Sequence, residues 1–251
     1  MDSSQKLQIK KEGHIATLSM VQKTNILGFE LINELICALE ELNLEPEIKV
    51  VILTGNGAKS FIAGADIKTM QKLDVSGAVS FITSLHTLIN KVRTIDKVVI
   101  AAINGHCFGG GLELAICCDF IIASENATFG MQEVALGIPS VIEAALFPFL
   151  VGIAKTREFL LLGQVFDAPE ALSCGLINRM TADGDLLREA NKWAEKFADN
   201  PPHALAQQKH LINRWLENAG FDQSVKNGID AFGIAFGNDK TREILSQAFK
   251  K

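Results

Sequence analysis

The chain has 251 residues, of which 48% are hydrophobic, and its formal net charge is −5. This length suits one large domain, or a domain with an appendage, and it allows a substantial core. No stretch of about 18 apolar residues is free of charge, which argues against a membrane span. No block of Lys and Arg stands out, so a nucleic-acid partner has little support.

The N-terminal segment and the cysteines indicate a reducing compartment. Residues 1–6 contain neither an apolar signal region nor an Arg-rich transit pattern. The five cysteines are an odd number and form no C-x-x-C pair, so a disulfide framework is not expected. We expect a cytoplasmic protein, or a mature organellar form. The five histidines have no metal-ligand spacing, and no metal site is predicted.

Hydrophobic periodicity predicts strands that alternate with helices over most of the chain. Helices are indicated by apolar residues at helical spacing, and buried strands by continuous apolar runs. In chain order we predict strands over 7–9 and 15–20, a helix over 32–42, a strand over 50–54, a helix over 79–92, and strands over 98–103 and 119–123. This alternation is typical of an α/β fold with largely parallel strands.

The last third of the chain has a helical pattern. Asp167 to Glu170 has the sequence of a capping box, and apolar spacing predicts helices over 186–197 and 205–216, separated by Pro201-Pro202. No strand signal follows residue 183. We therefore divide the chain into an α/β core over 1–182 and a helical C-terminal region over 183–251. The apolar content of that region predicts packing on another subunit.

The segment most informative about function is a glycine cluster next to a glutamate. Gly109-Gly110-Gly111 is followed by Glu113, and Glu133 comes twenty residues later. Glycine lets a backbone amide approach a ligand closely, and two convergent carboxylates can act as general acid and base. The segment 61–68 could offer a second free amide. Two amides and two carboxylates around one carbonyl would suit enolate chemistry on an acyl compound.

Each of these features also has a plain structural interpretation. Glu113 alone would be a carboxylate at a helix N-terminus, Glu133 a surface residue and the glycines a close-packed turn. Only the combination favours a catalytic site. The glycine-containing turn over 55–60 has neither the spacing of a P-loop nor that of a dinucleotide-binding loop. A P-loop nucleotidase and a Rossmann enzyme are therefore disfavoured.

Several ordered motifs extend the glycine cluster over most of the chain. They occupy residues 50–55, 61–67, 101–105, 109–115, 118–119, 129–133, 136–139 and 168–177. Together they resemble the crotonase superfamily, whose best-known members are enoyl-CoA hydratases and isomerases. The resemblance implies a crotonase-like spiral of ββα units with a C-terminal helical region. It also implies a homotrimer or homohexamer, with the apolar tail at subunit contacts: Phe232, Ile234, Phe236, Ile244, Leu245 and Phe249.

Carried over position by position, the resemblance implies the residues of an acyl-CoA site. The backbone amides of Ala65 and Gly110 would form the oxyanion hole, and Glu113 and Glu133 would be the catalytic glutamates. Coenzyme A would be part of the substrate, so no separate cofactor is expected. The Ala63 region would line its adenine end. The full set of substrate-binding positions would be Ala63, Gly64, Asp66, Ile67, Gly109, Pro139, Val141 and Glu143.

Two glutamates favour hydration of a 2-enoyl-CoA to a 3-hydroxyacyl-CoA, because an isomerase could manage with one base. The alternative is a Δ3,Δ2-enoyl-CoA isomerase or another crotonase reaction such as thioester hydrolysis. The same fold hosts different reactions, so both stay open. A non-catalytic or RNA-binding family member is disfavoured by the acidic balance and by the two retained glutamates.

The sequence departs from the family pattern after Pro139. Many hydratases have Gly-Ala-Gly-Gly-Thr-Gln-Arg at this point, whereas this chain has Ser140 to Leu146, including Glu143. In one interpretation Glu143 lies in the first turn of a helix begun by Pro139-Ser140 and is favoured by the helix dipole. In the other it is a third polar group in the acyl pocket, where it raises the pKa of a neighbouring carboxyl and favours a polar or short acyl group.

Overall fold

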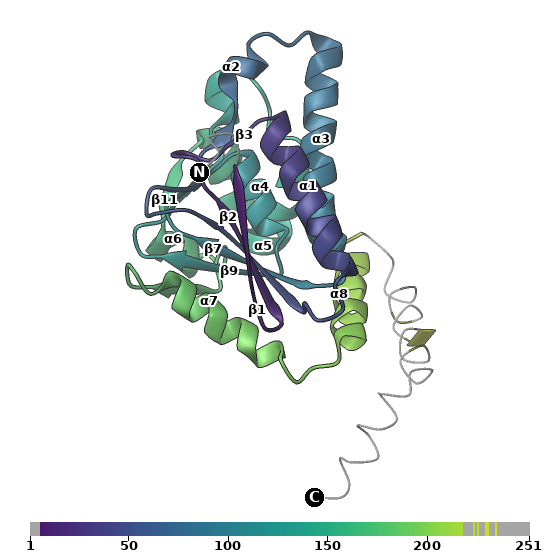
Figure 1. Cartoon of the computed structure of the whole chain (residues 1–251). Coiled ribbons are helices and arrows are strands. Elements are labelled where there is room, and N and C mark those ends of the chain that lie inside the picture. Colours follow the sequence, from purple (N-terminus) through teal and green to yellow (C-terminus); the bar gives the residue numbers. More distant parts are fainter. Residues whose placement is uncertain (1–5, 218–222, 224, 226–228, 231–233, 235–251) are drawn as a thin grey trace, which may run out of the picture.

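The computed structural model describes residues 6–217 together with residues 223, 225, 229, 230 and 234. Figure 1 shows a twisted sheet with two long helices, α1 (Phe29–Leu44) and α3 (Val75–Thr94), on one side and α7 (Leu186–Ala194) on the other. Within this described part of the chain, no helix combines the length and the apolar character needed to cross a membrane.

The large sheet has six strands in the order β1-β2-β4-β7-β9-β12. Its first pair is an antiparallel hairpin, and all its other pairs are parallel. The continuous apolar runs form β4, β7 and β9, which confirms the predicted α/β fold. The strands are β1 (Leu7–Glu12), β2 (Ile15–Met20), β4 (Val50–Gly55), β7 (Val98–Ile103), β9 (Phe120–Ser124) and β12 (Arg179–Thr181).

Short strands that the periodicity did not reveal form two further sheets. A four-stranded sheet has the order β11-β10-β8-β5, and β3 pairs with β6. Each strand has only two or three residues, too few for an alternating pattern to stand out. They are β3 (Ile26–Leu27), β5 (Ser60–Ile62), β6 (Gly64–Ala65), β8 (His106–Phe108), β10 (Thr128–Gly130) and β11 (Val165–Asp167).

The chain winds as a spiral because one unit recurs along it. β4 in the large sheet is followed by β5 in the second sheet and then by α3, and β7, β8 and α4 repeat this order. β9 and β10 begin a third unit. The predicted spiral of ββα units is therefore confirmed. The other helical segments are α2 (Ile67–Met70), α4 (Gly110–Ile116), η1 (Glu133–Leu136), η2 (Glu143–Leu146), α5 (Phe147–Leu162), α6 (Ala168–Ser173), η3 (Glu195–Phe197) and α8 (Pro202–Leu216).

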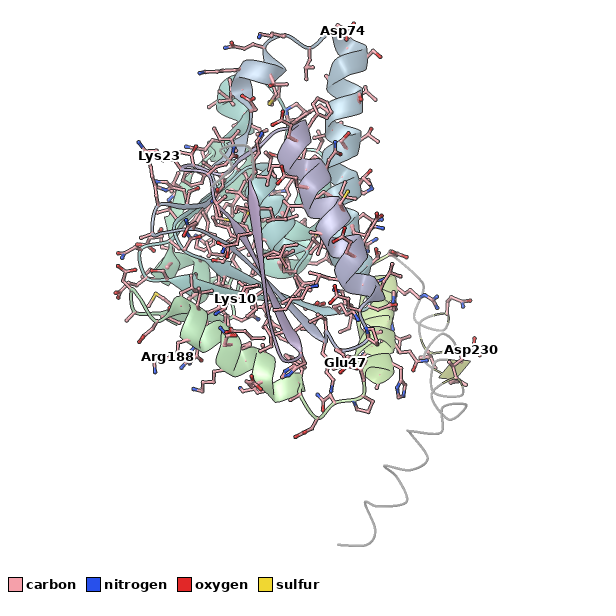
Figure 2. The ribbon with its side chains drawn as sticks, in the orientation of Figure 1. Lys10, Lys23, Glu47, Asp74, Arg188 and Asp230 are labelled. Atoms are coloured by element: carbon pink, nitrogen blue, oxygen red, sulfur yellow. The ribbon has the colours of Figure 1, made fainter. Side chains whose placement is uncertain are left out.

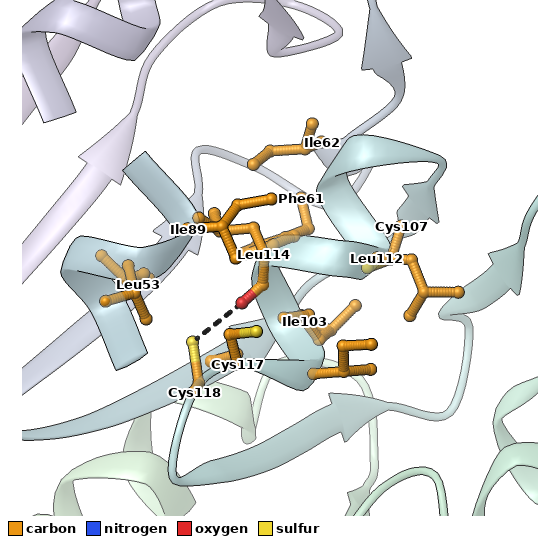
Figure 3. Close-up of a cluster of buried hydrophobic side chains, with 14 of the residues drawn as sticks. Leu53, Phe61, Ile62, Ile89, Ile103, Cys107, Leu112, Leu114, Cys117 and Cys118 are labelled. Carbon is orange, nitrogen blue, oxygen red and sulfur yellow. Dashed lines mark hydrogen bonds between the residues drawn. The ribbon is translucent and has the colours of Figure 1, made fainter. Parts of the chain in front are cut away.

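Side chains of the central strands alternate between two apolar layers. Val51 and Leu53 belong to the layer shared with α1 and α3, whereas Val50 and Ile52 face the layer that α7 covers. This period of two is the reason why a strand buried on both faces is a continuous apolar run. Figure 3 shows the first layer around α4, where the Cys118 thiol lies 3.5 Å from the Leu114 carbonyl oxygen.

Polar residues define the ends and edges of these layers. The Asp74 side chain accepts a hydrogen bond of 2.7 Å from the Gly77 amide and so caps α3. The predicted capping box of Asp167 and Glu170 is present at α6. Lys10 lies on the edge strand β1, where charge discourages pairing with another chain (Figure 2).

The described part of the C-terminal region packs on the sheet. Leu186, Ala190 and Ala194 of α7 are buried against the outer apolar layer. Pro202 is the first residue of α8, a position where proline is favourable, so Pro201-Pro202 both follows one helix and begins the next. Among the tail residues predicted at subunit contacts, Ile234 is exposed. The others, Phe232, Phe236, Ile244, Leu245 and Phe249, lie outside the described residues.

A buried lysine attaches α8 to the end of α3. Lys209 Nζ donates to the carbonyl oxygens of Val92 and Lys97, each at 3.0 Å, and to Asp119 Oδ2 at 2.8 Å. Burial raises the pKa of Asp119, and the Lys209 charge opposes this shift. The ammonium group therefore satisfies a carbonyl near the C-terminus of α3 and compensates a carboxylate beside β7.

We expect Lys209→Met to lower the free energy of unfolding by about 3 kcal/mol, because it leaves the partly buried Asp119 carboxylate without its cation. Denaturant unfolding followed by circular dichroism measures this. The control is Arg188→Met, which breaks an ion pair on the exposed surface of α7 and should leave the unfolding midpoint unchanged. Equal midpoints for Lys209→Met and the wild type would contradict the assignment.

Candidate functional site

The candidate site lies where two parallel strands of the second sheet end. β8 and β10 are paired so that Phe108 is opposite Gly130, and their carboxyl ends share one edge. The Gly109 amide then donates to the Gly130 carbonyl oxygen at 2.9 Å. Glu133 follows β10 by three residues. The register of this pair therefore brings the glycine cluster and the second glutamate side by side.

Gly109 requires glycine for two reasons. Its backbone φ of 52° lies in the region that residues other than glycine rarely adopt. A Cβ built at this position would lie only 2.5 Å from Glu133 Oε1. The absent side chain thus leaves room for the Glu133 carboxylate against the backbone. Gly110 is the first residue of α4, where amides have no acceptor within the helix.

The segment that carries Ala65 lies against the same turn. β6 pairs with β3, and the Asp66 amide donates to the Leu27 carbonyl oxygen at 3.0 Å. The Gly64 Cα is 4.0 Å from the position of a Cβ on Gly109. Two stretches of glycine-containing backbone, one at Gly64 and one at Gly109, therefore approach each other closely.

Glu113 is a buried carboxyl group, with 4% of its surface exposed. It lies one turn after Gly110 in α4, and its Oε1 accepts a hydrogen bond of 2.9 Å from the Ala144 amide. Burial raises the pKa of Glu113 from 4.5 to about 7, and the nearby charges of Glu133 and Glu143 add to the shift. The amides of Ala144 and Ile142 act in the opposite direction. A carboxyl group with this pKa can gain and lose a proton near neutral pH.

Glu133 begins η1 and is only partly buried. The Ser140 hydroxyl donates to its Oε2 at 3.0 Å, while its Oε1 faces the Gly109 backbone. The two glutamates thus differ in environment, because Glu113 is enclosed by protein and Glu133 borders the cavity described next. Such a difference is what separates the roles of paired carboxyl groups.

A cavity of about 350 Å³ opens beside Glu133. Six residues that the sequence predicted for the site line it, and its other walls are mostly apolar. The predicted residues are Ala63, Gly64, Ala65, Ile67, Gly109 and Glu133, and the others are Met70, Phe108, Gln132, Ala135, Leu136 and Ile138.

The remaining predicted residues have other positions. Gly110 and Glu113 are buried residues of α4, and neither is among the described residues that line the cavity. The Asp66 carboxylate caps α2 by accepting from the Lys68 amide and the Thr69 hydroxyl. Pro139 and Val141 are exposed and do not line this cavity.

Glu143 is buried, with 7% of its surface exposed. It does not lie in a helix begun by Pro139-Ser140, because the helical turn starts at Glu143 itself and has no side-chain cap. Its Oε1 lies 2.6 Å from His86 Nδ1 of α3, and it is not among the residues that line the cavity. Burial raises the pKa of Glu143, and the proximity of His86 opposes the shift.

Three contributors to the site were not predicted. Ser140 and His86 contact the carboxylates of Glu133 and Glu143, and Ala144 supplies a backbone amide. An amide has no side-chain signal. His86 is 57 residues from Glu143, and no spacing rule joins them. Ser140 could have been found as a hydroxyl where the family pattern has glycine. In the described part of the chain, no three His, Cys, Asp or Glu residues cluster in a way that could hold a metal ion.

Known proteins similar to this chain share both its sequence pattern and its fold. The profile of the enoyl-CoA hydratase/isomerase family matches residues 10–249. A short-chain-enoyl-CoA hydratase of Clostridium acetobutylicum is 33% identical, with 97% of this chain and 94% of the relative covered. A crotonyl-CoA hydratase of Syntrophomonas wolfei is 34% identical over the same shares. An enoyl-CoA hydratase structure from Bacillus anthracis superimposes with a TM-score of 0.92 at 31% identity, covering 98% and 96% of the two chains. 

The raised pKa of Glu113 predicts a pH-dependent loss of stability. Its folded pKa of about 7 exceeds its ordinary 4.5, so the protonated carboxyl is favoured in the folded state. The stability that the wild type has below pH 4.5 is therefore reduced by ionisation of Glu113 as the pH rises through 7. Glu113→Gln removes this loss and keeps an acceptor for the Ala144 amide. We expect its stability relative to the wild type to increase by up to about 3 kcal/mol between pH 5 and pH 8.

Urea unfolding at both pH values checks this expectation. Glu40→Gln serves as the control, because it removes an exposed carboxylate of α1 that is paired with Lys91. The same pH dependence in Glu113→Gln as in the wild type would show that Glu113 titrates normally.

Proposed function

The chain belongs to the enoyl-CoA hydratase/isomerase family, and we propose that it is an enoyl-CoA hydratase, a hydro-lyase that adds water across the double bond of a 2-enoyl-CoA thioester to give a 3-hydroxyacyl-CoA. The observation that carries this proposal is the Glu133 carboxylate against the Gly109 backbone, with Glu113, a buried carboxyl group whose pKa the Glu133 charge helps to raise, in the helix that follows this turn. The names of relatives that match nearly the whole chain support the same reaction.

Addition of water to a conjugated double bond requires negative charge to gather on the carbonyl oxygen. We propose that the amides of Ala65 and Gly110 donate to this oxygen and so stabilise the enolate. The close approach of Gly64 to Gly109 supports this role, because it brings the two backbone segments to one point. Losing one such donor typically costs on the order of 10²–10³ in rate.

The two glutamates then move protons. One takes a proton from water as the oxygen attacks the β-carbon, and the other supplies a proton to the α-carbon. Glu113 suits either task because its pKa of about 7 lets it accept and release a proton near neutral pH. The Ser140 hydroxyl orients Glu133 from the opposite side of its carboxylate.

The cavity beside Glu133 is proposed to hold the substrate. Its apolar walls, including Ile67, Leu136 and Ile138, suit an acyl chain. The backbone of Ala63 and Gly64 is proposed to bind part of the coenzyme A moiety, with the adenine end near Ala63. Coenzyme A belongs to the substrate, so the proposed reaction needs no separate cofactor.

A homotrimer or homohexamer in the cytoplasm completes the proposal. Large apolar side chains of α5 are exposed in the single chain, among them Phe149, Ile153, Leu161 and Leu162. An exposed apolar surface of this kind favours association with another subunit. Sedimentation velocity at micromolar concentration tests the assembly. We expect a trimer or hexamer, and a monomer would contradict it.

Hydration of crotonyl-CoA, followed by loss of the absorbance of the conjugated thioester, is the direct test of function. A panel of 2-enoyl-CoA and 3-enoyl-CoA thioesters with product identification separates the alternatives. A 3-hydroxyacyl-CoA product supports the hydratase. A shifted double bond indicates the isomerase, and free coenzyme A indicates thioester hydrolysis.

We predict that Glu113→Gln and Glu133→Gln each lower the kcat of hydration by roughly 10²–10⁴, because each keeps its size but cannot transfer a proton. Circular dichroism verifies the fold of each variant. Glu170→Gln at the capping box of α6 is a control that should retain wild-type turnover. Near-full turnover of Glu113→Gln would mean that the reaction does not use two glutamates.

Gly109→Ala tests the turn itself. Its methyl group would meet Glu133 Oε1 and displace the carboxylate. We expect kcat/KM to fall at least about tenfold. Gly137→Ala is the matched control, because Gly137 also has a positive φ, of 78°, but a Cβ there meets nothing within 4 Å. If both variants lose activity equally, backbone strain rather than displacement of Glu133 is responsible.

A further inference from the structure

The short turn η2 is held at two points, and this linkage connects Glu113 to α3. On one side, the Ala144 amide donates to Glu113 Oε1 at 2.9 Å, and the Ile142 amide also stabilises that carboxylate. On the other side, Glu143 Oε1 lies 2.6 Å from His86 Nδ1. Glu143 stands between the two amides in the chain. Its side chain therefore attaches to α3 the same three residues whose backbone holds Glu113.

The buried Glu143 carboxylate has too few hydrogen-bond partners for its two oxygens. Its Oε2 is buried and has no hydrogen-bond partner. An unsatisfied buried carboxylate oxygen is costly, and such a group in a folded protein calls for an explanation. His86 is half exposed, so its ring joins this buried carboxylate to the protein surface. An apolar residue at 143 would pack here without that cost.

We propose that His86 and Glu143 form a positioning pair for Glu113, in which their hydrogen bond fixes η2 on α3 so that the Ala144 amide and the Glu143 charge are held against the Glu113 carboxyl group. The expected changes in kcat and kcat/KM rest on the proposed function, whereas the expected change in the titration of Glu113 does not. Neither residue is required to touch the substrate.

The charges around Glu113 predict what this pair does to its titration. Glu133 of η1 and Glu143 of η2 both disfavour a charge on Glu113, and the Cys117 thiol, just after α4, lies near Glu113 and Glu143. His86 and Arg93 of α3 oppose the field of Glu143. Removing the Glu143 carboxylate removes one of two negative neighbours, so the pKa of Glu113 should fall.

Glu143→Gln isolates the effect of the charge, because glutamine can still accept the His86 hydrogen bond. NMR of protein labelled with ¹³C at the glutamate carboxyl carbon follows the titration directly, with the Glu113 signal assigned by its absence in Glu113→Gln. We expect the Glu113 midpoint to fall by about half a pH unit or more, and the acidic limb of kcat/KM to move with it. Glu40→Gln is the control and should leave both unchanged.

His86→Ala isolates the effect of the hydrogen bond between His86 and Glu143. We expect kcat to fall about tenfold while KM stays within about threefold, because η2 is no longer fixed on α3. His86→Gln can donate to Glu143 Oε1 through its side-chain amide, and it should restore most of the lost turnover. A merely structural role would lower thermal stability in His86→Ala without moving the acidic limb or the Glu113 signal.

An unchanged Glu113 titration in Glu143→Gln, or wild-type kcat in His86→Ala, would overturn the proposal. The NMR titration needs no turnover. If the wild type hydrates none of the thioesters, the proposed function fails, whereas the titration still decides whether Glu143 and His86 act on Glu113.

Discussion

The candidate site depends on one close approach, that of the Glu133 carboxylate to the backbone at Gly109. Parallel pairing of β8 and β10 makes this approach possible, because the two chain segments leave the second sheet at the same edge. The positive φ of Gly109 turns the chain into α4, and its missing side chain leaves space for Glu133 Oε1. The first amide of α4 and the Glu113 side chain are then fixed by helical geometry. A substituent at this one position would disturb the cavity, the turn and both glutamates together.

Burial of Glu113 is the second constraint on the site, because it makes ionisation of this carboxyl group unfavourable. A carboxyl group 4% exposed, with two carboxylates nearby, resists ionisation, and its pKa rises to about 7. The fold limits this shift with backbone amides from the segment 142–144 rather than with a cation. The nearby Arg93 pairs with Glu217 and acts on Glu143, and it is not among the groups that shift the pKa of Glu113. A carboxyl group kept near neutrality in this way can exchange a proton at neutral pH, which a fully compensated one could not.

The sequence predicted those features that follow from local chemistry or from strong patterns. The apolar runs over 50–54 and 98–103 predicted the central strands because strands buried on both faces have no polar alternation. The glycine cluster and the two glutamates stood out because no single structural role explains their combination.

The short strands of the second sheet were missed, since a strand of two or three residues is too short to show an alternating pattern. The partnership of His86 with Glu143 was also missed, because only the packing of α3 on η2 brings them together. Glu143 fits neither interpretation completely: it begins the turn and adds to the field at Glu113, yet the described cavity is not lined by it.

The distribution of polarity around the cavity bears on what enters it. The Glu133 carboxylate, which lies against Gly109, is the charged group among the described residues that line the cavity, and Glu113 is buried in the adjoining helix α4. Three apolar lining residues are exposed to solvent: Ile67 is 49% exposed, Leu136 58% and Ile138 37%. Exposed apolar side chains at the rim of a cavity gain stability when a ligand covers them, whereas buried carboxyl groups gain only from a ligand that shares or accepts a proton. A molecule with a polar reacting centre and an apolar extension suits both the carboxyl groups and the apolar walls.

The segment after Glu133 lacks the glycines that are common in hydratases at this point. Instead, the Ser140 hydroxyl donates to the Glu133 carboxylate, and the Ala144 amide donates to the Glu113 carboxyl group. This segment therefore acts on the two glutamates through hydrogen bonds rather than through the shape of a glycine loop.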